Sequence, residues 1–155
     1  MLRKTALLAA GALLAAGPAL ASGDGASDAE KAVEYREAVF TAMGHNFGPM
    51  VAMMKGEIAW DGDAFAKRAE RVAALAGMPW EGFVEGTADI KGSEAKAAIW
   101  DNRTDFDKLS QQLQERTAAL AEAAAGGAER GAVGKAFKRV GETCKSCHDD
   151  FKQDD

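Results

Sequence analysis

The chain has 155 residues, of which 47% are apolar and 28% charged, and its formal net charge at pH 7 is −5. This length and composition fit one globular domain with a single hydrophobic core, and they exclude a disordered chain. Ala and Gly are abundant while Pro and β-branched residues are few, so helices are favoured over strands. An acidic chain without a basic cluster is a poor partner for nucleic acid and for anionic membranes, and we expect neither.

The first 21 residues have the pattern of a secretory signal peptide. Arg3 and Lys4 give a positive start, an apolar run follows from Ala6 to Ala16, and Ala19-Leu20-Ala21 is a small-x-small cleavage site. The apolar run has 11 residues, too few to span a bilayer, which takes about 20. We therefore expect an exported, periplasmic domain of residues 22–155. Without Arg3 and Lys4, 17 basic residues remain against 24 acidic ones, a net charge of −7.

A long first helix is expected from Ser27 onward. Ser27 and Glu30 have the spacing of a capping box. Pro49 lies inside the helical pattern and is expected to kink or loosen the helix, because it removes a backbone donor. Residues 55–62 then form a connector. The seam of this helix recurs in steps of three and four, as in a helix bundle: Val33, Arg36, Phe40, Met43, Phe47, Met50 and Met54.

A second helix is expected from Asp63 to Ala76, with Gly77 as its C-terminal cap. Its apolar residues share one stripe: Phe65, Ala69, Val72 and Ala76. Residues 78–93 are rich in Gly and show no period, which predicts a long loop of a kind that is often functional. The large apolar side chains of this loop are expected to fold back onto the domain: Trp80, Phe83 and Val84.

Residues 94–125 are helical in composition, with a break expected near Asp101-Asn102, and Gly126-Gly127 ends this segment. A last helix is expected from about Ala128 to Lys152. The third long helix has the stripe Phe106, Leu109, Leu113, Arg116 and Leu120, and the last has Val133, Phe137, Val140, Cys144, Cys147 and Phe151. Four amphipathic helices without a strand pattern predict an all-α fold, an antiparallel four-helix bundle.

The last helix carries the only two cysteines, in the sequence Cys144-Lys145-Ser146-Cys147-His148. The spacing C-x-x-C-H is the attachment signature of c-type haem. Residues three and four apart share one face of a helix, so both cysteines can form thioethers and His148 can reach the iron. The cysteines also lie on the apolar stripe, where a large apolar plate would dock. The predicted cofactor is one covalent haem c in the bundle core.

Other uses of two cysteines fit less well. An exported pair can form a disulfide, but so short a loop constrains the unfolded chain little. A thioredoxin-like pair needs a βαβ setting, and a zinc site takes four ligands. The only other histidine, His45, lies off the seam and is expected at the surface. Among the methionines, only Met43 is a candidate for a place near the iron.

The chain resembles cytochrome c′, the exported four-helix c-type cytochromes whose haem motif lies near the C-terminus. The resemblance covers nearly all of residues 28–152. The matching segments are Ala32-Val33-Glu34-Tyr35-Arg36, Phe40-Thr41-Ala42-Met43, Met78-Pro79-Trp80 with Phe83 and Gly86-Thr87, Ile99-Trp100, and Ala136-Phe137-Lys138-Arg139-Val140-Gly141 running into the haem motif.

The resemblance implies roles for the matching residues. Cys144 and Cys147 match the thioether cysteines and His148 the axial ligand of the iron. Arg36 matches an arginine near the haem propionates, where a guanidinium can pair with a carboxylate. Glu37 stands where many relatives have Gln. The family also implies a homodimer packed through the first two helices.

The sixth position of the iron decides between functions. In low-spin relatives, a Met lies four residues after the arginine that matches Arg36, and here that position is Phe40. The resemblance therefore implies a five-coordinate, high-spin haem that binds nitric oxide and carbon monoxide, transfers electrons to an unidentified redox partner, or does both. The alternative is a low-spin electron carrier with a Met ligand, for which Met43 is the candidate. Trp80 is expected beside the haem, and Lys152, where many relatives have Arg, near its proximal face.

A haem peroxidase would need polar distal groups, so we expect that the protein is not an enzyme.

Overall fold

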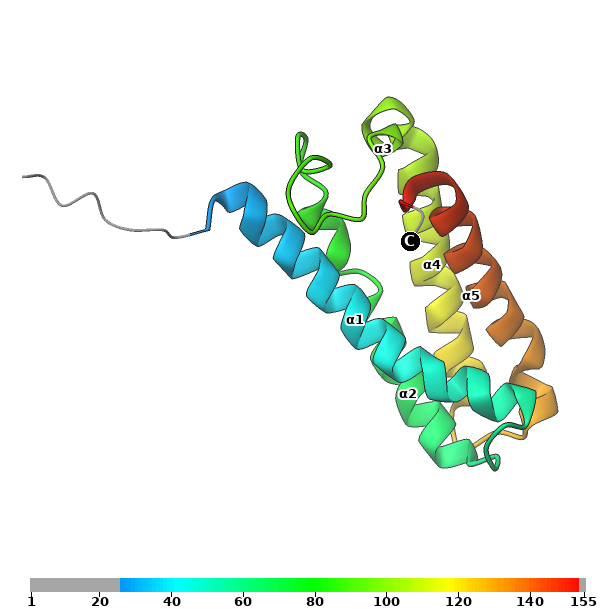
Figure 1. Cartoon of the computed structure of the whole chain (residues 1–155). Coiled ribbons are helices and arrows are strands. Elements are labelled where there is room, and N and C mark those ends of the chain that lie inside the picture. The colour runs from blue at the N-terminus through cyan, green and yellow to red at the C-terminus, as the bar shows by residue number, and fades with distance from the viewer. Residues whose placement is uncertain (1–25, 154–155) are drawn as a thin grey trace, which may run out of the picture.

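The computed structural model describes residues 26–153 and shows an antiparallel four-helix bundle (Figure 1). The long helices are α1 (Asp28–Lys55), α2 (Gly62–Leu75), α4 (Arg103–Ala124) and α5 (Arg130–Phe151), joined by a 3₁₀ turn, η1 (Pro79–Gly82), and a short helix, α3 (Ala98–Asp101). Helix α2 packs against α1 and α4, and α4 packs against α5. The predicted fold class is confirmed. The predicted signal peptide lies outside the described residues.

Helix α1 begins where the capping box predicts. The backbone N–H of Glu30 donates to Ser27 Oγ (3.2 Å), and that of Ser27 donates to Glu30 Oε2 (2.6 Å). The helix continues through Pro49, which leaves the carbonyl of His45 without its usual helical donor. Arg68 of α2 donates to that carbonyl from Nη1 (3.3 Å). Pro49 thus does not end the helix, and it frees an acceptor for a link to α2.

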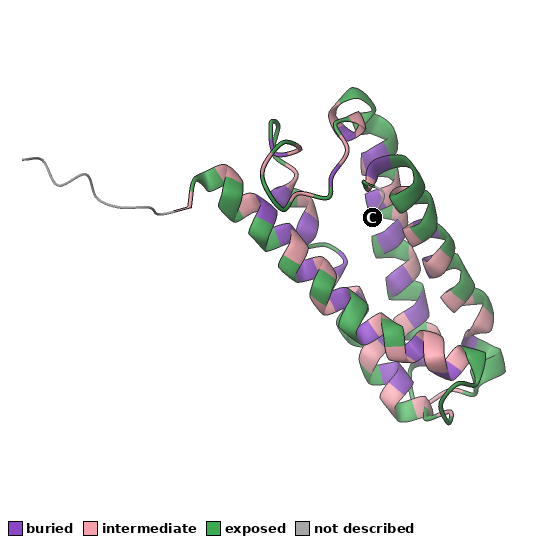
Figure 2. Ribbon diagram, viewed as in Figure 1, coloured by how far each residue is buried: buried purple, intermediate pink, exposed green. Residues whose placement is uncertain are grey.

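The buried face of α1 differs from the predicted seam. Three predicted members, Phe40, Phe47 and Met54, are only half-buried, while their neighbours Val39, Asn46 and Met53 are buried (Figure 2). All three still pack against the core, so they belong to the seam but are incompletely buried. The reason for the two phenylalanines is that they face a cavity, described below.

The segment between η1 and α4 contains further departures. Residues 94–97, which we expected to be helical, precede α3, and residues 94–96 form an extended strap across the end of α5. The N–H of Lys96 donates to the Phe151 carbonyl (2.9 Å), and that of Gln153 donates to the Glu94 carbonyl (2.7 Å). The break expected near Asp101-Asn102 is present, because α3 ends at Asp101 and α4 starts at Arg103.

Two smaller predictions about the second helix and its loop were wrong. Ala76, in a right-handed conformation, caps α2 instead of Gly77. Val84 is 50% exposed and does not fold back, whereas Trp80 and Phe83 pack against the core. The carbonyl of Val84 accepts bonds from the N–H (3.2 Å) and the hydroxyl (2.7 Å) of Thr87, which closes a turn with the Val84 side chain outside.

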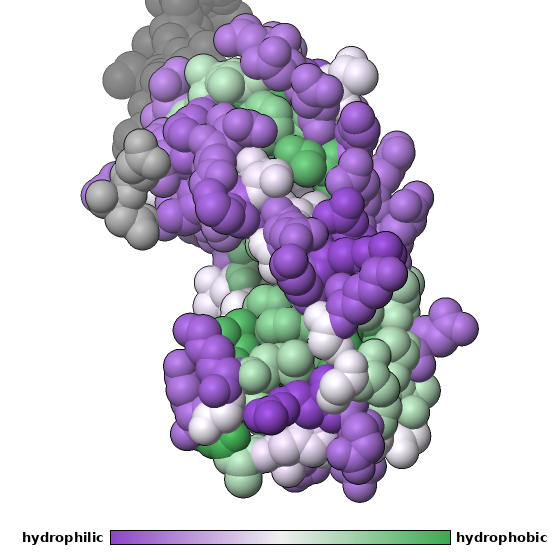
Figure 3. All heavy atoms as spheres, turned by 90° about the vertical axis from the view of Figure 1, so that its right-hand side faces the viewer, coloured by the Kyte–Doolittle hydropathy of each residue, from purple (hydrophilic) through white to green (hydrophobic). Residues whose placement is uncertain are grey.

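The two halves of α5 differ in their surfaces. Figure 3 shows the face on the right-hand side of Figure 1, where hydrophilic residues surround a hydrophobic patch in the upper part and hydrophobic and hydrophilic residues are mixed in the lower part. The first half of α5 is rich in small residues, and its last turns carry Lys145, Asp149 and Asp150. In the part of the chain that the structure describes, no helix combines the length and apolar character needed to cross a membrane.

Candidate functional site

A cavity of about 460 Å³ lies within the bundle, in the size range of ligand sites. Most of its lining comes from α1, α4 and α5, and Val72 of α2, Trp80 of η1, the strap and Ile99 of α3 also line it. The walls are mostly apolar, with a series of aromatic rings: Phe40, Phe47, Trp80, Phe83, Phe106 and Phe151. Such a lining suits a large apolar ligand better than a charged one.

Helix α5 brings both cysteines and His148 to this cavity. The two thiols are free and half-buried. Burial raises the pKa of both thiols, that of Cys147 to about 11, with smaller contributions from Cys144 and Asp150. A thiol redox pair or a thiolate metal site needs a lowered pKa, so these surroundings favour neutral thiols facing an apolar ligand. The side chain of His148 is exposed at the cavity wall.

The wall that α1 contributes is built around Phe40. Its ring makes edge contacts with Trp80 (ring centroids 5.8 Å apart) and Phe83 (6.2 Å). The indole of Trp80 is held in turn by its Nε1–H, which donates to the Ala76 carbonyl (2.6 Å). Met43 is buried on the same wall and lines the cavity. The three residues that sequence reasoning placed around this side, Phe40, Met43 and Trp80, therefore meet at one cavity.

One end of the cavity is charged. Glu37, Glu94 and Lys152 line it there, and Lys152 Nζ lies 3.4 Å from Glu94 Oε2. The pKa of Glu37 is raised, first by burial and then by the neighbouring Glu94 carboxylate. Glu37 and Lys152 thus lie at the cavity, although the sequence offered no reason to pair Lys152 with Glu94.

Arg36 is fully buried, but it does not line the cavity. Its Nη1 donates to the Gly82 carbonyl (2.8 Å) and to Thr87 Oγ1 (2.7 Å), and its Nη2 donates to Ser93 Oγ (2.7 Å) and to the Thr87 carbonyl (3.3 Å). Nε is buried without a hydrogen bond, 3.9 Å from Glu37 Oε1. The guanidinium therefore anchors the loop after η1, and its predicted contact with haem propionates stays a prediction.

Gly82 lets the loop approach α1 closely enough for this anchor. A Cβ at Gly82 would lie 2.7 Å from the Ala32 carbonyl oxygen and 2.9 Å from Arg36 Cβ, so any side chain would force the two segments apart. Sequence reasoning missed Gly82, Thr87 and Ser93 as partners of Arg36. One feature of the sequence could have indicated these partners: Arg36 is a charged residue on an otherwise apolar seam. A buried guanidinium needs hydrogen-bond acceptors around it.

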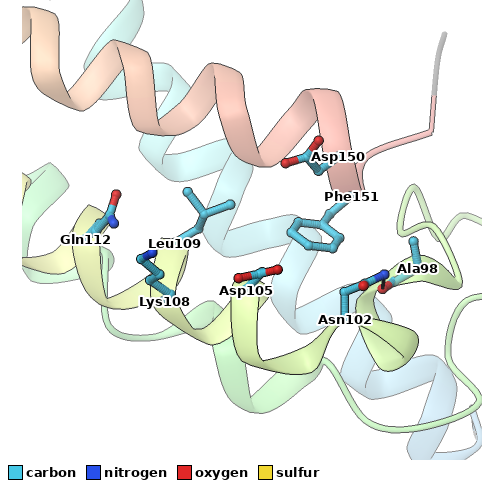
Figure 4. A pocket seen from close by; sticks show the side chains of 8 residues that line it. All are labelled: Ala98, Asn102, Asp105, Lys108, Leu109, Gln112, Asp150 and Phe151. Carbon is cyan, nitrogen blue, oxygen red and sulfur yellow. Dashed lines mark hydrogen bonds between the residues drawn. The ribbon is translucent and has the colours of Figure 1, made fainter.

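A second groove, of about 500 Å³, lies between α4 and α5 on the outside of the bundle (Figure 4). Asp105 and Lys108 of α4 and Asp150 of α5 stand at its rim. Leu109 and Phe151 line both this groove and the cavity, so they separate the two. The cysteines line only the cavity. His45, predicted at the surface, is exposed and lines neither.

Comparison with known proteins agrees with this geometry. The family model described as cytochrome c′ matches residues 31–152. A cytochrome c′ from Halomonas halodenitrificans is 41% identical over 129 residues, which cover 81% of this chain and 98% of the relative. The solved structure of cytochrome c prime from Shewanella frigidimarina, 41% identical, has a TM-score of 0.78 and covers 84% of this chain and 100% of its own.

Two further solved structures contain bound gases. Both are variants of cytochrome c prime from Alcaligenes xylosoxidans. One is a nitric oxide complex with a TM-score of 0.74 at 30% identity, covering 84% of this chain and 100% of its own. The other has carbon monoxide bound, with a TM-score of 0.73 at 31% identity, covering 83% and 98%.

Proposed function

Because the chain belongs to the cytochrome c′ family, we propose that it is an exported c-type cytochrome that carries one haem c and binds nitric oxide and carbon monoxide. The observation that carries this proposal is the apolar cavity onto which Cys144, Cys147 and His148 converge. The gas complexes of the Alcaligenes xylosoxidans variants, proteins of the same fold, support the choice of ligands.

The residues at the cavity fit a haem. Cys144 and Cys147 are the thiols that would form the two thioether bonds, and His148 is the nitrogen ligand proposed for the iron. A haem held there would supply an iron atom that can bind a small neutral ligand. The aromatic walls would give the haem an apolar setting, and burial in the same setting raises the pKa of the two thiols.

The wall around Phe40 favours small neutral ligands. Its phenyl ring has no lone pair to offer a metal, and an apolar wall disfavours anions. No distal role falls to His45, which is exposed outside the cavity. We therefore assign a binding role and no enzymatic one, since peroxidase chemistry needs polar distal groups. Electron transfer to a redox partner and assembly as a homodimer through α1 and α2 stay predictions.

Replacing Phe40 tests the proposed function directly. We expect a wild-type ferric spectrum typical of five-coordinate, high-spin haem. Phe40→Ala is expected to speed carbon monoxide binding by about tenfold or more, because removing a ring that must move lowers the barrier by about 1.4 kcal/mol or more. Phe40→Met is expected to give a six-coordinate, low-spin iron. Absorption spectra and flash photolysis measure these outcomes.

Met43→Leu serves as the control for these variants, because Met43 lines the same cavity. It should leave the ferric spectrum unchanged. A wild-type methionine-to-iron charge-transfer band that disappears in Met43→Leu would instead make the protein a low-spin electron carrier.

Intact-mass spectrometry of the exported protein tests covalent attachment and processing together. We expect a chain that begins at Ser22 and carries the mass of one haem that acid-acetone extraction does not remove. The motivation is the cleavage site at Ala19-Leu20-Ala21 and the single attachment motif. A bare-chain mass after extraction would contradict covalent attachment, whereas retention of residues 1–21 would contradict only the export prediction.

A further inference from the structure

Gly44 stands in the interior of α1, where glycine costs about 1 kcal/mol relative to alanine. It lines the cavity, four residues after Phe40 and therefore one helical turn further on. Outside its own helix backbone and its chain neighbours, a Cβ built at Gly44 would meet no atom within 4 Å, so no packing contact requires glycine there. Gly44 is exposed, and open space lies over it at the cavity wall.

A side chain at position 44 would intrude on the surroundings of Phe40. Side chains of a helix lean toward its N-terminus, so a residue at 44 would cover the turn that carries Phe40 and Thr41. On its other side, the ring of Phe40 is bounded by Trp80 and Phe83. Trp80 is itself fixed by its hydrogen bond to the Ala76 carbonyl. Trp80 and Phe83 therefore restrict the ring of Phe40, whereas the position of a Cβ at Gly44 is open.

We propose that Gly44 is a specificity-determining residue that gives the ring of Phe40 room to move when a small gas binds. This inference rests on the proposed function, because it assumes that Phe40 covers the ligand position. The glycine would then help to set the rate at which a ligand enters and the largest ligand that can enter. Sequence periodicity does not reveal such a role.

The chain offers a matched control in Gly48. It lies one turn further along the same helix, is exposed, and likewise has no protein atom within 4 Å of a built Cβ, but it does not line the cavity. Gly44→Ala and Gly48→Ala gain the same helix propensity. Both are expected to raise the melting temperature of the holoprotein by a few degrees, roughly 3 °C.

The experiment is a double-mutant cycle between Gly44→Ala and Phe40→Ala, with carbon monoxide as the probe. Flash photolysis of the ferrous holoprotein gives the association rate. Gly44→Ala is expected to slow association by about tenfold, a barrier increase of about 1.4 kcal/mol, and Gly44→Leu to slow it further. In the Phe40→Ala background, Gly44→Ala should change nothing, because no ring has to move. Gly48→Ala should match wild type in rate, and all ferric spectra of the glycine variants should match that of wild type.

The outcomes separate this inference from the proposed function. The role of Gly44 would be overturned by any of three results. Gly44→Ala could slow carbon monoxide association equally in both backgrounds, it could slow association in neither, or it could alter the ferric spectrum. The proposed function would still stand if Phe40→Ala alone speeds association. If wild type binds no carbon monoxide, the proposed function fails first, and the role of Gly44 fails with it.

Discussion

A protein in which Cys144 and Cys147 are both replaced by serine is expected to lose its covalent haem and most of its thermal stability. Without the ligand, the cavity of about 460 Å³ would be left with its apolar walls facing water or a void. At about 24 cal/mol per Å³, a void of that size costs roughly 10 kcal/mol before the walls relax. That cost is comparable with the whole free energy of unfolding of an ordinary domain.

Thermal melting followed by circular dichroism measures this effect, and absorbance of the extracted protein reports haem content. Ser146→Ala is the matched control, since Ser146 lies within the same motif and is exposed. It should melt like wild type. A destabilisation of about 1 kcal/mol would lower the melting temperature by more than about 2 °C. A double cysteine variant that melts within about 2 °C of wild type would therefore show that the haem is not part of the core.

Arg36→Leu is expected to destabilise the fold severely, with or without an effect on the haem. The substitution removes the donors for four hydrogen bonds and leaves Gly82, Thr87 and Ser93 with unsatisfied oxygen atoms under the loop. Breaking a buried charged network typically costs about 3–5 kcal/mol. The melting temperature should then fall by roughly 10 °C or more.

Arg103→Leu provides the comparison for this prediction. Arg103 is half-exposed, forms an ion pair with Asp107 (2.8 Å) and donates to the Phe83 carbonyl (3.3 Å). Exposed pairs contribute about 0–1 kcal/mol, so the melting temperature should change little. Proteolysis between residues 83 and 93 should increase only in Arg36→Leu. Equal melting temperatures for the two variants would contradict the anchoring role of Arg36.

Hydrophobic periodicity and short motifs predicted those features of the fold that are determined by residues close together in the sequence. The capping box fixed the start of α1, and heptad-like steps predicted four long helices to within a few residues. The C-x-x-C-H spacing identified Cys144, Cys147 and His148 among the cavity-lining residues of α5. In each case the determining residues lie within one or two turns of one another.

Long-range contacts account for what the sequence did not predict. The strap at residues 94–96 is extended because its partners are at the end of α5, more than fifty residues later. The partners of Arg36 are 46–57 residues away, in a loop without periodicity. Phe40 and Phe47 share the helical period of a buried seam, but periodicity does not distinguish a side chain that packs against protein from one that faces a ligand cavity.

The strap also bears on the order in which the site is assembled. Its backbone bonds to Phe151, the last residue of α5, and to Gln153, two residues further on, both within five residues of His148. The strap takes up its extended form only when the end of α5 is present, because its backbone partners, Phe151 and Gln153, lie there. Glu94 and Ala95 of the strap line the cavity. This part of the wall is therefore completed by residues that follow the attachment motif, and removal of the residues after His148 would open it.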